Sequence, residues 1–222
     1  MKNLYNKDFV PNYKNTEIID NNVRRLLAPN PSPFTFYGTG TYIIGKKELA
    51  VIDPGPKIDT HISSLLGLIE KKSLVHLFIT HTHADHSPAA QVIKEKTNSI
   101  TYGFGPYPYE KYDTKFEEGH DLNFDPDIKL KDGDKIKGED WTIKAIHTPG
   151  HTSNHMCFGL EENSILFTGD HIMGWSTTVV IPPDGDMSSY MESLKKVLLY
   201  NYRTFLPTHG GPIKEPRKFV KA

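Results

Sequence analysis

The first part of the chain alternates between short apolar runs and turn residues. Residues 23–28, 41–44 and 49–53 are mostly aliphatic or β-branched, and prolines, glycines and charged residues separate them. This pattern predicts antiparallel strands that are joined by turns. We therefore expect a β meander at the start of the fold.

A helix, a buried strand and a second helix are predicted next. Apolar residues recur at helical spacing over 58–70, whereas 74–79 is a nearly unbroken apolar run, typical of an interior strand covered on both faces. Ser87 and Pro88 suit the N-cap and the first position of a helix over 88–96. The positive end of that helix is expected to face the candidate site and to favour anionic groups.

The second half of the chain repeats this order of strands followed by a helix. The strands are predicted over residues 128–130, 141–147, 156–160 and 165–168, and the helix over 187–200. Two β-rich halves with helices outside predict an αββα sandwich, of the α+β or α/β class, formed by residues 1–222 as a single domain. Residues 103–127 lack periodicity and are rich in Tyr, Pro, Gly and charge, which indicates a long functional loop or a partly ordered insert that could face the substrate.

Composition narrows the classes of function. Asp and Glu number 27 against 26 Lys and Arg, so the totals indicate neither a polyanion-binding surface nor an acidic tail. The single Cys157 excludes an internal disulfide and lies in an apolar run, which suits a reducing compartment. Residues 1–16 lack the continuous apolar segment that is typical of a secretory signal, and no run of about 18 apolar residues occurs in the sequence. We expect a cytoplasmic protein without a membrane partner, and the sequence leaves its oligomeric state open.

Histidine is the residue type that points to a chemistry. The chain contains 11 His, and three of them stand with one Asp in the run HTHADH at residues 81–86. Polar side chains directly behind an apolar strand are costly to bury unless they are paired or coordinated. In a turning loop the first two histidines project to one side, whereas the aspartate and the last histidine follow the bend. The run can therefore address two nearby ions.

Three later segments each add one candidate ligand at the end of a strand. Each stands beside Gly or Pro, which allow the sharp turns that aim a side chain into a shared crevice. Imidazole and carboxylate together favour two zinc ions, with manganese or iron as alternatives, over calcium. The seven candidate metal ligands are His81, His83, Asp85, His86, His151, Asp170 and His209.

These motifs, HxHxDH followed by a His, an Asp and a final His, resemble those of the metallo-β-lactamase superfamily over nearly the whole chain. Residues 30–35, 130–134 and 148–156 resemble most the branch named after β-lactamase-like protein 2, which includes endoribonucleases directed at single strands. The resemblance implies how the ligands are shared. His81, His83 and His151 would hold one ion, Asp85, His86 and His209 the other, and Asp170 would bridge them.

Two residues are candidates for catalytic roles beside the ions. Asp85 is placed to orient the attacking hydroxide as well as to bind a metal. His155 stands in a His-Met pair that the resembling branch also carries, and it is expected to hydrogen-bond a ligand or to contact the substrate. His155 could equally be a packed residue.

The expected activity is hydrolysis by a hydroxide that two zinc ions share. The resemblance favours phosphodiester cleavage, so the substrate would be a single-stranded nucleic acid or a small molecule. The metal site alone does not determine which bond is cleaved. The alternative is therefore a carbonyl hydrolase that acts on a thioester, lactone or β-lactam, as in glyoxalase II. A non-catalytic metal-binding scaffold is the third reading.

The resembling branch continues past its last histidine into a winged-helix-like segment, whereas only residues 210–222 follow His209 here. We expect such a chain to cleave a small phosphodiester better than an oligoribonucleotide.

Overall fold

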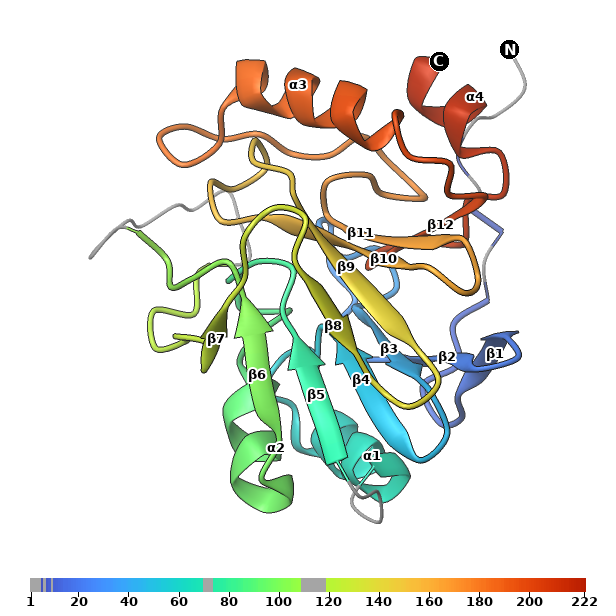
Figure 1. Cartoon of the computed structure of the whole chain (residues 1–222), viewed down its shortest axis with the longest axis vertical. Helices are drawn as coiled ribbons and strands as arrows, with labels where there is room; N and C mark the ends of the chain where they lie inside the picture. The colour runs from blue at the N-terminus through green and yellow to red at the C-terminus, as the bar shows by residue number, and fades with distance from the viewer. Residues whose placement is uncertain (1–4, 6, 9, 70–73, 109–118) are drawn as a thin grey trace.

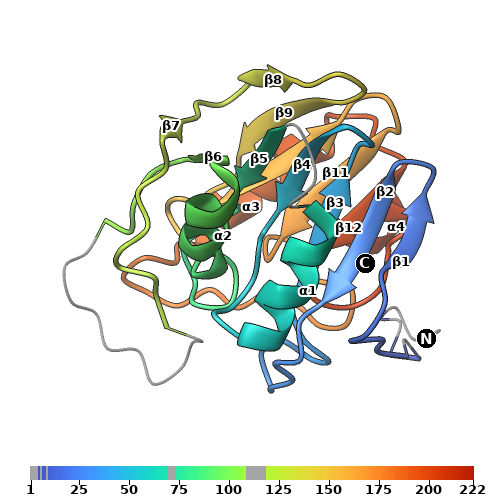
Figure 2. The same cartoon turned by 90° about the horizontal axis from the view of Figure 1, so that it is seen from below.

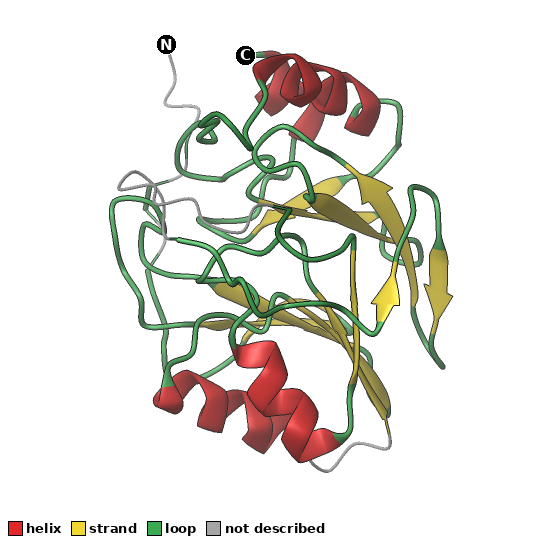
Figure 3. Ribbon diagram, turned by 90° about the vertical axis from the view of Figure 1, so that its left-hand side faces the viewer, coloured by secondary structure: helices red, strands yellow, loops and turns green. Residues whose placement is uncertain are grey.

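Two β-sheets lie face to face, and helices cover the outer face of each sheet (Figures 1 and 3). The structure is a computed structural model and describes residues 5, 7–8, 10–69, 74–108 and 119–222. The predicted αββα sandwich is confirmed. Within the described residues, no helix is both long and apolar enough to cross a membrane.

The first sheet has seven strands, which follow one another in chain order. They are β1 (Glu17–Asp20), β2 (Val23–Leu27), β3 (Gly40–Ile44), β4 (Glu48–Ile52), β5 (Leu74–Phe78), β6 (Ile100–Gly103) and β7 (Ile128–Lys129). The strands from β1 to β4 pair antiparallel, and those from β4 to β7 pair parallel. Two helices, α1 (Asp59–Ile69) and α2 (Ala89–Thr97), connect β4 to β5 and β5 to β6 and cover this sheet (Figure 2).

The second sheet has five strands in the order β12-β11-β10-β9-β8. They are β8 (Lys135–Lys137), β9 (Thr142–His147), β10 (Met156–Leu160), β11 (Ile165–Gly169) and β12 (Thr204–Pro207). The strands β11 and β12 pair parallel, and the other neighbours in this sheet pair antiparallel. The outer face is covered by α3 (Met187–Val197) and α4 (Pro216–Lys221).

The apolar strands supply side chains to two cores at once. On β4, Ala50 lies in the core between the sheets, whereas Val51 lies in the core beneath α1 and α2. On β10, Phe158 lies in the core between the sheets, and Cys157 lies in the core beneath α3 and α4. Because successive side chains of a strand point to opposite faces, such strands are apolar at every position.

The predicted start of α2 is wrong. Pro88 rather than Ser87 holds the N-cap position, and no side chain caps the helix. The Ser87 hydroxyl instead donates to Asp121 Oδ2 at 2.8 Å, and the N–H of Ala89 donates to the carbonyl oxygen of Gly55 at 3.0 Å. The first N–H of this helix is therefore bound within the protein, and the predicted preference of this helix end for anionic groups finds no support.

The sequence pattern did not predict β1, β6, β8, β12 or α4. β1 and β8 are edge strands without a buried side chain, so they lack the apolar alternation on which the prediction depends.

Of the long loop predicted over 103–127, residues 109–118 lie outside the described part. Its far end lies beside the HTHADH run, where the N–H of Ala84 donates to Gly119 and the N–H of Asp121 to Thr82.

Candidate metal centre

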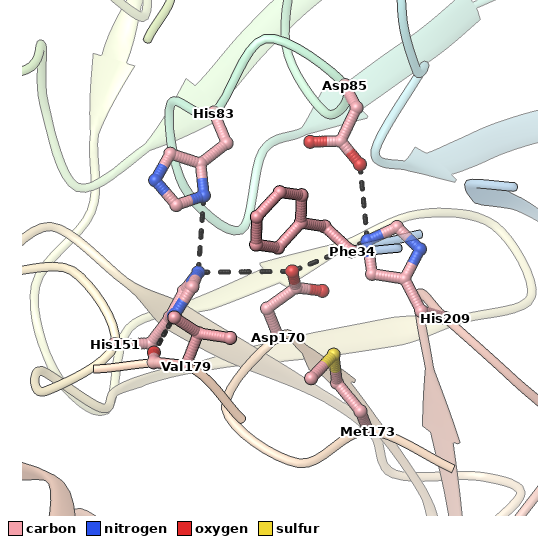
Figure 4. A pocket seen from close by; sticks show the side chains of 8 residues that line it. All are labelled: Phe34, His83, Asp85, His151, Asp170, Met173, Val179 and His209. Atoms are coloured by element: carbon pink, nitrogen blue, oxygen red, sulfur yellow. Dashed lines mark hydrogen bonds and ion pairs between the residues drawn. The ribbon is translucent and has the colours of Figure 1, made fainter. Parts of the chain in front are cut away.

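All seven predicted ligands meet at one edge of the sandwich. The run at 81–86 follows β5, His151 lies between β9 and β10, Asp170 follows β11, and His209 follows β12. Each of these strands ends at the same edge, so its following loop reaches the same crevice. A pocket opens there (Figure 4), and its lining consists of Phe34, His83, Asp85, His151, Asp170, Met173, Val179 and His209.

Three histidines form the first group, which we call the imidazole group: His81, His83 and His151. His83 Nδ1 lies 2.9 Å from His81 Nε2 and 3.2 Å from His151 Nε2. The remaining pair, His81 Nε2 and His151 Nε2, is 3.3 Å apart. Tetrahedral zinc with ordinary Zn–N bonds separates its nitrogen ligands by about 3.3 Å. The spacing of the three nitrogens therefore fits one shared ion.

The second group, which we call the carboxylate group, consists of Asp85, His86 and His209. Asp85 Oδ2 lies 3.2 Å from His209 Nε2 and 3.4 Å from His86 Nε2. All three residues are buried, and both histidines are almost inaccessible to solvent. The set of two imidazoles and one carboxylate is a typical donor set for zinc, manganese or iron.

Asp170 lies between the two groups. Its Oδ2 is 3.3 Å from His209 Nε2 and 3.9 Å from His151 Nε2, and its Oδ1 is 3.6 Å from His86 Nε2. Among the described residues, Asp170 Oδ1 and His86 Nε2 are buried atoms without a hydrogen-bond partner. Buried polar atoms are normally satisfied. A cation held between these atoms would satisfy both, so the residues fit a metal ion.

The outer nitrogens of the ligand histidines are held by acceptors. Three rings direct their Nδ1 to oxygen atoms: His86 to Asp53 Oδ2 at 2.8 Å, His151 to Val179 O at 2.6 Å and His209 to Gly38 O at 3.1 Å. Because a carbonyl or carboxylate oxygen can only accept, each Nδ1 carries the proton. The opposite Nε2 is then the nitrogen that would bind a metal once its own proton has left, which is the usual arrangement around zinc.

Sequence reasoning missed Asp53, because it treats this residue only as part of the turn that ends a strand. The buried Asp53 carboxylate accepts from the N–H and the hydroxyl of Thr80 at 2.8 Å each, from Thr208 Oγ1 at 3.1 Å and from the His86 ring. The signal in the sequence was an aspartate with a following Pro-Gly turn directly behind an apolar strand. Asp53 joins the ends of three strands beneath the site.

Sequence reasoning also missed Thr39. Its hydroxyl lies 2.8 Å from Asp85 Oδ2 and 2.9 Å from the Asn30 side-chain nitrogen. The Asn30 amide orientation is set, because its Oδ1 accepts from the Thr39 N–H at 2.9 Å. Asn30 therefore donates to the Thr39 hydroxyl, and the single hydroxyl proton of Thr39 goes to Asp85.

The two groups have opposite effects on histidine charge. Burial opposes protonation of His209, yet the carboxylates of Asp170 and Asp85 outweigh it and raise the pKa of His209 to about 10. In the imidazole group, burial and the neighbouring rings of His86 and His83 hold the pKa of His81 well below its ordinary value. The carboxylate group therefore attracts positive charge, whereas His81 in the imidazole group stays neutral.

His155 lies behind the ligands and does not line the pocket. The ring is fully buried, its Nε2 accepts from the Asp170 N–H at 3.2 Å, and its Nδ1 lies 2.9 Å from Thr148 Oγ1. Burial, followed by the nearby His171 and His151 rings, lowers the pKa of His155 well below its ordinary value. The position supports a role in orienting Asp170, and a catalytic role for His155 stays a prediction.

Comparison with known proteins places this geometry in a family. The sequence profile described as metallo-beta-lactamase superfamily matches residues 35–209. The chain is 33% identical over 209 residues to an atrochrysone carboxyl ACP thioesterase from Cryptosporiopsis sp. (strain 8999), covering 93% of the chain and 59% of that protein. It is 32% identical over 209 residues to a lactamase-like protein from Aspergillus niger, covering 93% of the chain and 60% of that protein.

The chain thus spans about three fifths of the length of these relatives. Their names do not establish the β-lactamase-like protein 2 branch, so the resemblance to that branch stays a prediction.

Solved structures show the same fold. A beta-lactamase domain protein from Burkholderia ambifaria matches with a TM-score of 0.75 and 19% identity, covering 97% of this chain and 76% of that one. A metallo-beta-lactamase family protein from Thermus thermophilus matches with a TM-score of 0.72 and 18% identity, covering 92% and 78%. The profile match over most of the chain, together with this fold, shows that the chain belongs to the metallo-beta-lactamase superfamily.

Proposed function

We propose that the chain is a metal-dependent hydrolase that cleaves a carbonyl substrate of the thioester class. One observation carries the proposal. The imidazole group and the carboxylate group are both buried and meet at Asp170, and the other residues that line the pocket are apolar. The thioesterase names of the relatives support the thioester. This was the alternative in the sequence analysis, and it is better supported than RNA cleavage.

The ligand roles follow the two groups. His81, His83 and His151 would hold one divalent ion, Asp85, His86 and His209 the second, and Asp170 would contact both. Zinc fits the donor set best, with manganese or iron as alternatives. Two such ions lower the pKa of a bound water and polarise the oxygen under attack.

The side chains around the ions position the reactants. Because Thr39 holds Asp85 Oδ2, the other oxygen, Oδ1, remains to orient the attacking water. Asp170 is held through its backbone, since its N–H donates to His155 and its carbonyl oxygen accepts from the Thr178 hydroxyl. These two hydrogen bonds hold the backbone of Asp170 and so keep its carboxylate in place during the reaction.

The pocket suits an acyl group better than a polynucleotide. Among the described residues, none of those that line it is Lys or Arg, although phosphate recognition usually depends on these cations. The pocket measures about 350 Å³ with the open solvent at its mouth included, which is near the lower end for small-molecule sites. Only the reacting part of a large thioester would enter it.

A substrate panel tests this proposal. Zinc-loaded protein is assayed on a thioester, a lactone, a β-lactam, a phosphodiester and single-stranded RNA, with Asp85→Asn as the control variant. We expect the highest kcat/KM for the thioester, and its loss in the variant. A dominant phosphodiesterase rate would refute the thioester assignment. An absence of bound metal would refute the metal-dependent hydrolase, and bound metal without turnover of any substrate would favour the non-catalytic scaffold.

A further inference from the structure

The pocket above the metal centre is lined by two chemical kinds of side chain. His83, Asp85, His151, Asp170 and His209 are polar, and Phe34, Met173 and Val179 are apolar (Figure 4). We call these two sets the polar side and the apolar side. The reaction proposed above uses only the polar side. In a thioester the acyl group extends from the carbonyl carbon, so an acyl group that enters this pocket has the apolar side available for contact.

Phe34 is held in place by its own loop. The Ser32 hydroxyl accepts from the N–H of Phe34 at 3.0 Å and from that of Thr35 at 3.1 Å. The Thr35 hydroxyl in turn donates to the carbonyl oxygen of Asn30 at 2.6 Å. Such side-chain-to-backbone bonds fix the course of a turn. The Phe34 ring is therefore presented to the pocket by an ordered backbone.

An aromatic stack joins this loop to the segment that carries the other two apolar residues. The ring of Phe36 lies 4.9 Å from that of Trp175 with an interplanar angle of 8°. Phe36 has a φ of 60°, a conformation that is rare for a bulky residue and persists only where the surroundings enforce it. Trp175 stands between Met173 and Val179 in the chain. The stack therefore fixes the two loops relative to each other.

The apolar side is also aligned with the metal centre. The carbonyl oxygen of Val179 accepts the Nδ1 proton of His151 at 2.6 Å. Val179 therefore lines the pocket with its side chain and holds a proposed ligand with its backbone. Met173 completes the surface with an unbranched, adaptable side chain. A carbonyl carbon at the metal centre and an acyl group on this surface can be held at the same time.

We propose that Phe34, Met173 and Val179 form an acyl-binding surface that selects an apolar, in particular an aromatic, acyl group, with Phe34 as the main specificity-determining residue. The proposal rests on the proposed function. An acyl group with a terminal carboxylate is excluded, because it would face Asp85 and Asp170 without a Lys or Arg among the described lining residues.

Three thioesters of the same thiol, N-acetylcysteamine, test the surface: phenylacetyl, acetyl and succinyl. For zinc-loaded wild type we expect kcat/KM for phenylacetyl to exceed that for acetyl by about 30-fold, with succinyl the poorest. Phe34→Ala should reduce this preference to about 3-fold or less, mainly through KM, and Phe34→Leu should keep most of it. Phe104→Ala removes an exposed aromatic ring that does not line the pocket, and it should change nothing.

Calorimetry with the product acids provides a readout without turnover. Phenylacetate should bind the zinc-loaded protein more tightly than acetate, and Phe34→Ala should abolish the difference. Cleavage of the thioesters without a preference for phenylacetyl, or an equal loss for phenylacetyl and acetyl in Phe34→Ala, would overturn the inference. If no thioester is cleaved, the proposed function fails, and the calorimetry alone tests the acyl-binding surface. A preference for phenylacetate over acetate that Phe34→Ala removes would support the surface. Equal binding of the two acids by the wild type would overturn it.

Discussion

The imidazole group and the carboxylate group are equally buried but differ in charge. Burial and neighbouring rings lower the pKa of His81, whereas two carboxylates raise that of His209 to about 10. The same side-chain type therefore titrates in opposite directions a few ångströms apart, according to whether a carboxylate is beside it. The carboxylate group offers charge to a cation, and the imidazole group offers only lone pairs.

The two groups also differ in what supports them. The carboxylate group has buried side-chain partners, since Asp53 holds His86 and Thr39 holds Asp85. In the imidazole group, His151 is held by a backbone carbonyl oxygen and His81 by the neighbouring Thr80 hydroxyl, 3.0 Å from its Nδ1. Substitutions of Asp53 and Thr39 should therefore weaken the carboxylate group more than the imidazole group.

The largest effect is expected from Asp170→Asn, because this residue contacts both groups. Removing the shared charge should lower kcat/KM for a thioester on the order of 10³-fold and reduce the bound zinc from two ions toward one. Elemental analysis and the thioester assay measure the two effects. Asp132→Asn, which removes an exposed partner of Lys196, should leave both unchanged. Two ions retained in Asp170→Asn would show that Asp170 does not join the groups.

Asp53→Asn should affect the carboxylate group more than the imidazole group, because Asp53 contacts His86 directly and reaches His81 only through the Thr80 hydroxyl. The amide cannot accept from all of the donors around Asp53, so we expect the metal-free protein to lose about 3 kcal/mol of unfolding free energy. The affinity for the second zinc ion should fall about 10- to 100-fold. Chemical denaturation and chelator competition measure these quantities.

The matched control is Asp184→Asn, which alters another buried carboxylate. Asp184 Oδ1 accepts from the Ser153 N–H at 3.1 Å, in the loop of His151. Its substitution should leave the second ion in place. Equal weakening of both ions by Asp53→Asn would contradict the separation of the two groups.

Thr39→Val tests the smaller support on Asp85. Valine keeps the shape of threonine but removes the hydroxyl that donates to Asp85 Oδ2, so we expect about 10-fold weaker binding of the second ion. Thr39→Ser restores the donor and should restore the affinity. If valine and serine behave alike, the hydrogen bond has no role in holding the carboxylate group. Chelator competition, read separately for each ion, distinguishes these outcomes.

The seven candidate ligands could be selected from the sequence because each is a polar residue in an otherwise apolar or turn-rich setting. The supports were harder to predict because their signals are local and common. Asp53 looks like any aspartate before Pro-Gly, and Thr39 like any threonine beside glycine; only the tertiary structure brings them within hydrogen-bond distance of His86 and Asp85.

The secondary structure shows the same limit of prediction from the sequence. Strand β10, which is buried along its whole length, was predicted at its observed ends because every position is apolar. The edge strand β1 has no buried side chain and was missed. Its pairing with β2 is set by backbone hydrogen bonds, which leave little trace in the residue pattern.

His61, a buried histidine outside both groups, allows the effect of burial to be measured apart from that of neighbouring charges. Its Nε2 lies 2.9 Å from the carbonyl oxygen of Pro54 and 3.1 Å from Thr41 Oγ1. Burial lowers the pKa of His61 from 6.5 to about 4. Between these values the unfolded chain binds the proton and the folded protein does not, so stability is present above pH 6.5 and is lost as the pH falls toward 4.

His61→Gln removes this titration while keeping a donor for Pro54. Between pH 7 and pH 5, the metal-free wild type should therefore lose about 2 kcal/mol more unfolding free energy than the variant does. Denaturant titrations at the two pH values measure the difference. An equal loss in both proteins would mean that burial alone does not suppress protonation in this fold, and the low pKa of His81 would then have to come from its neighbouring rings.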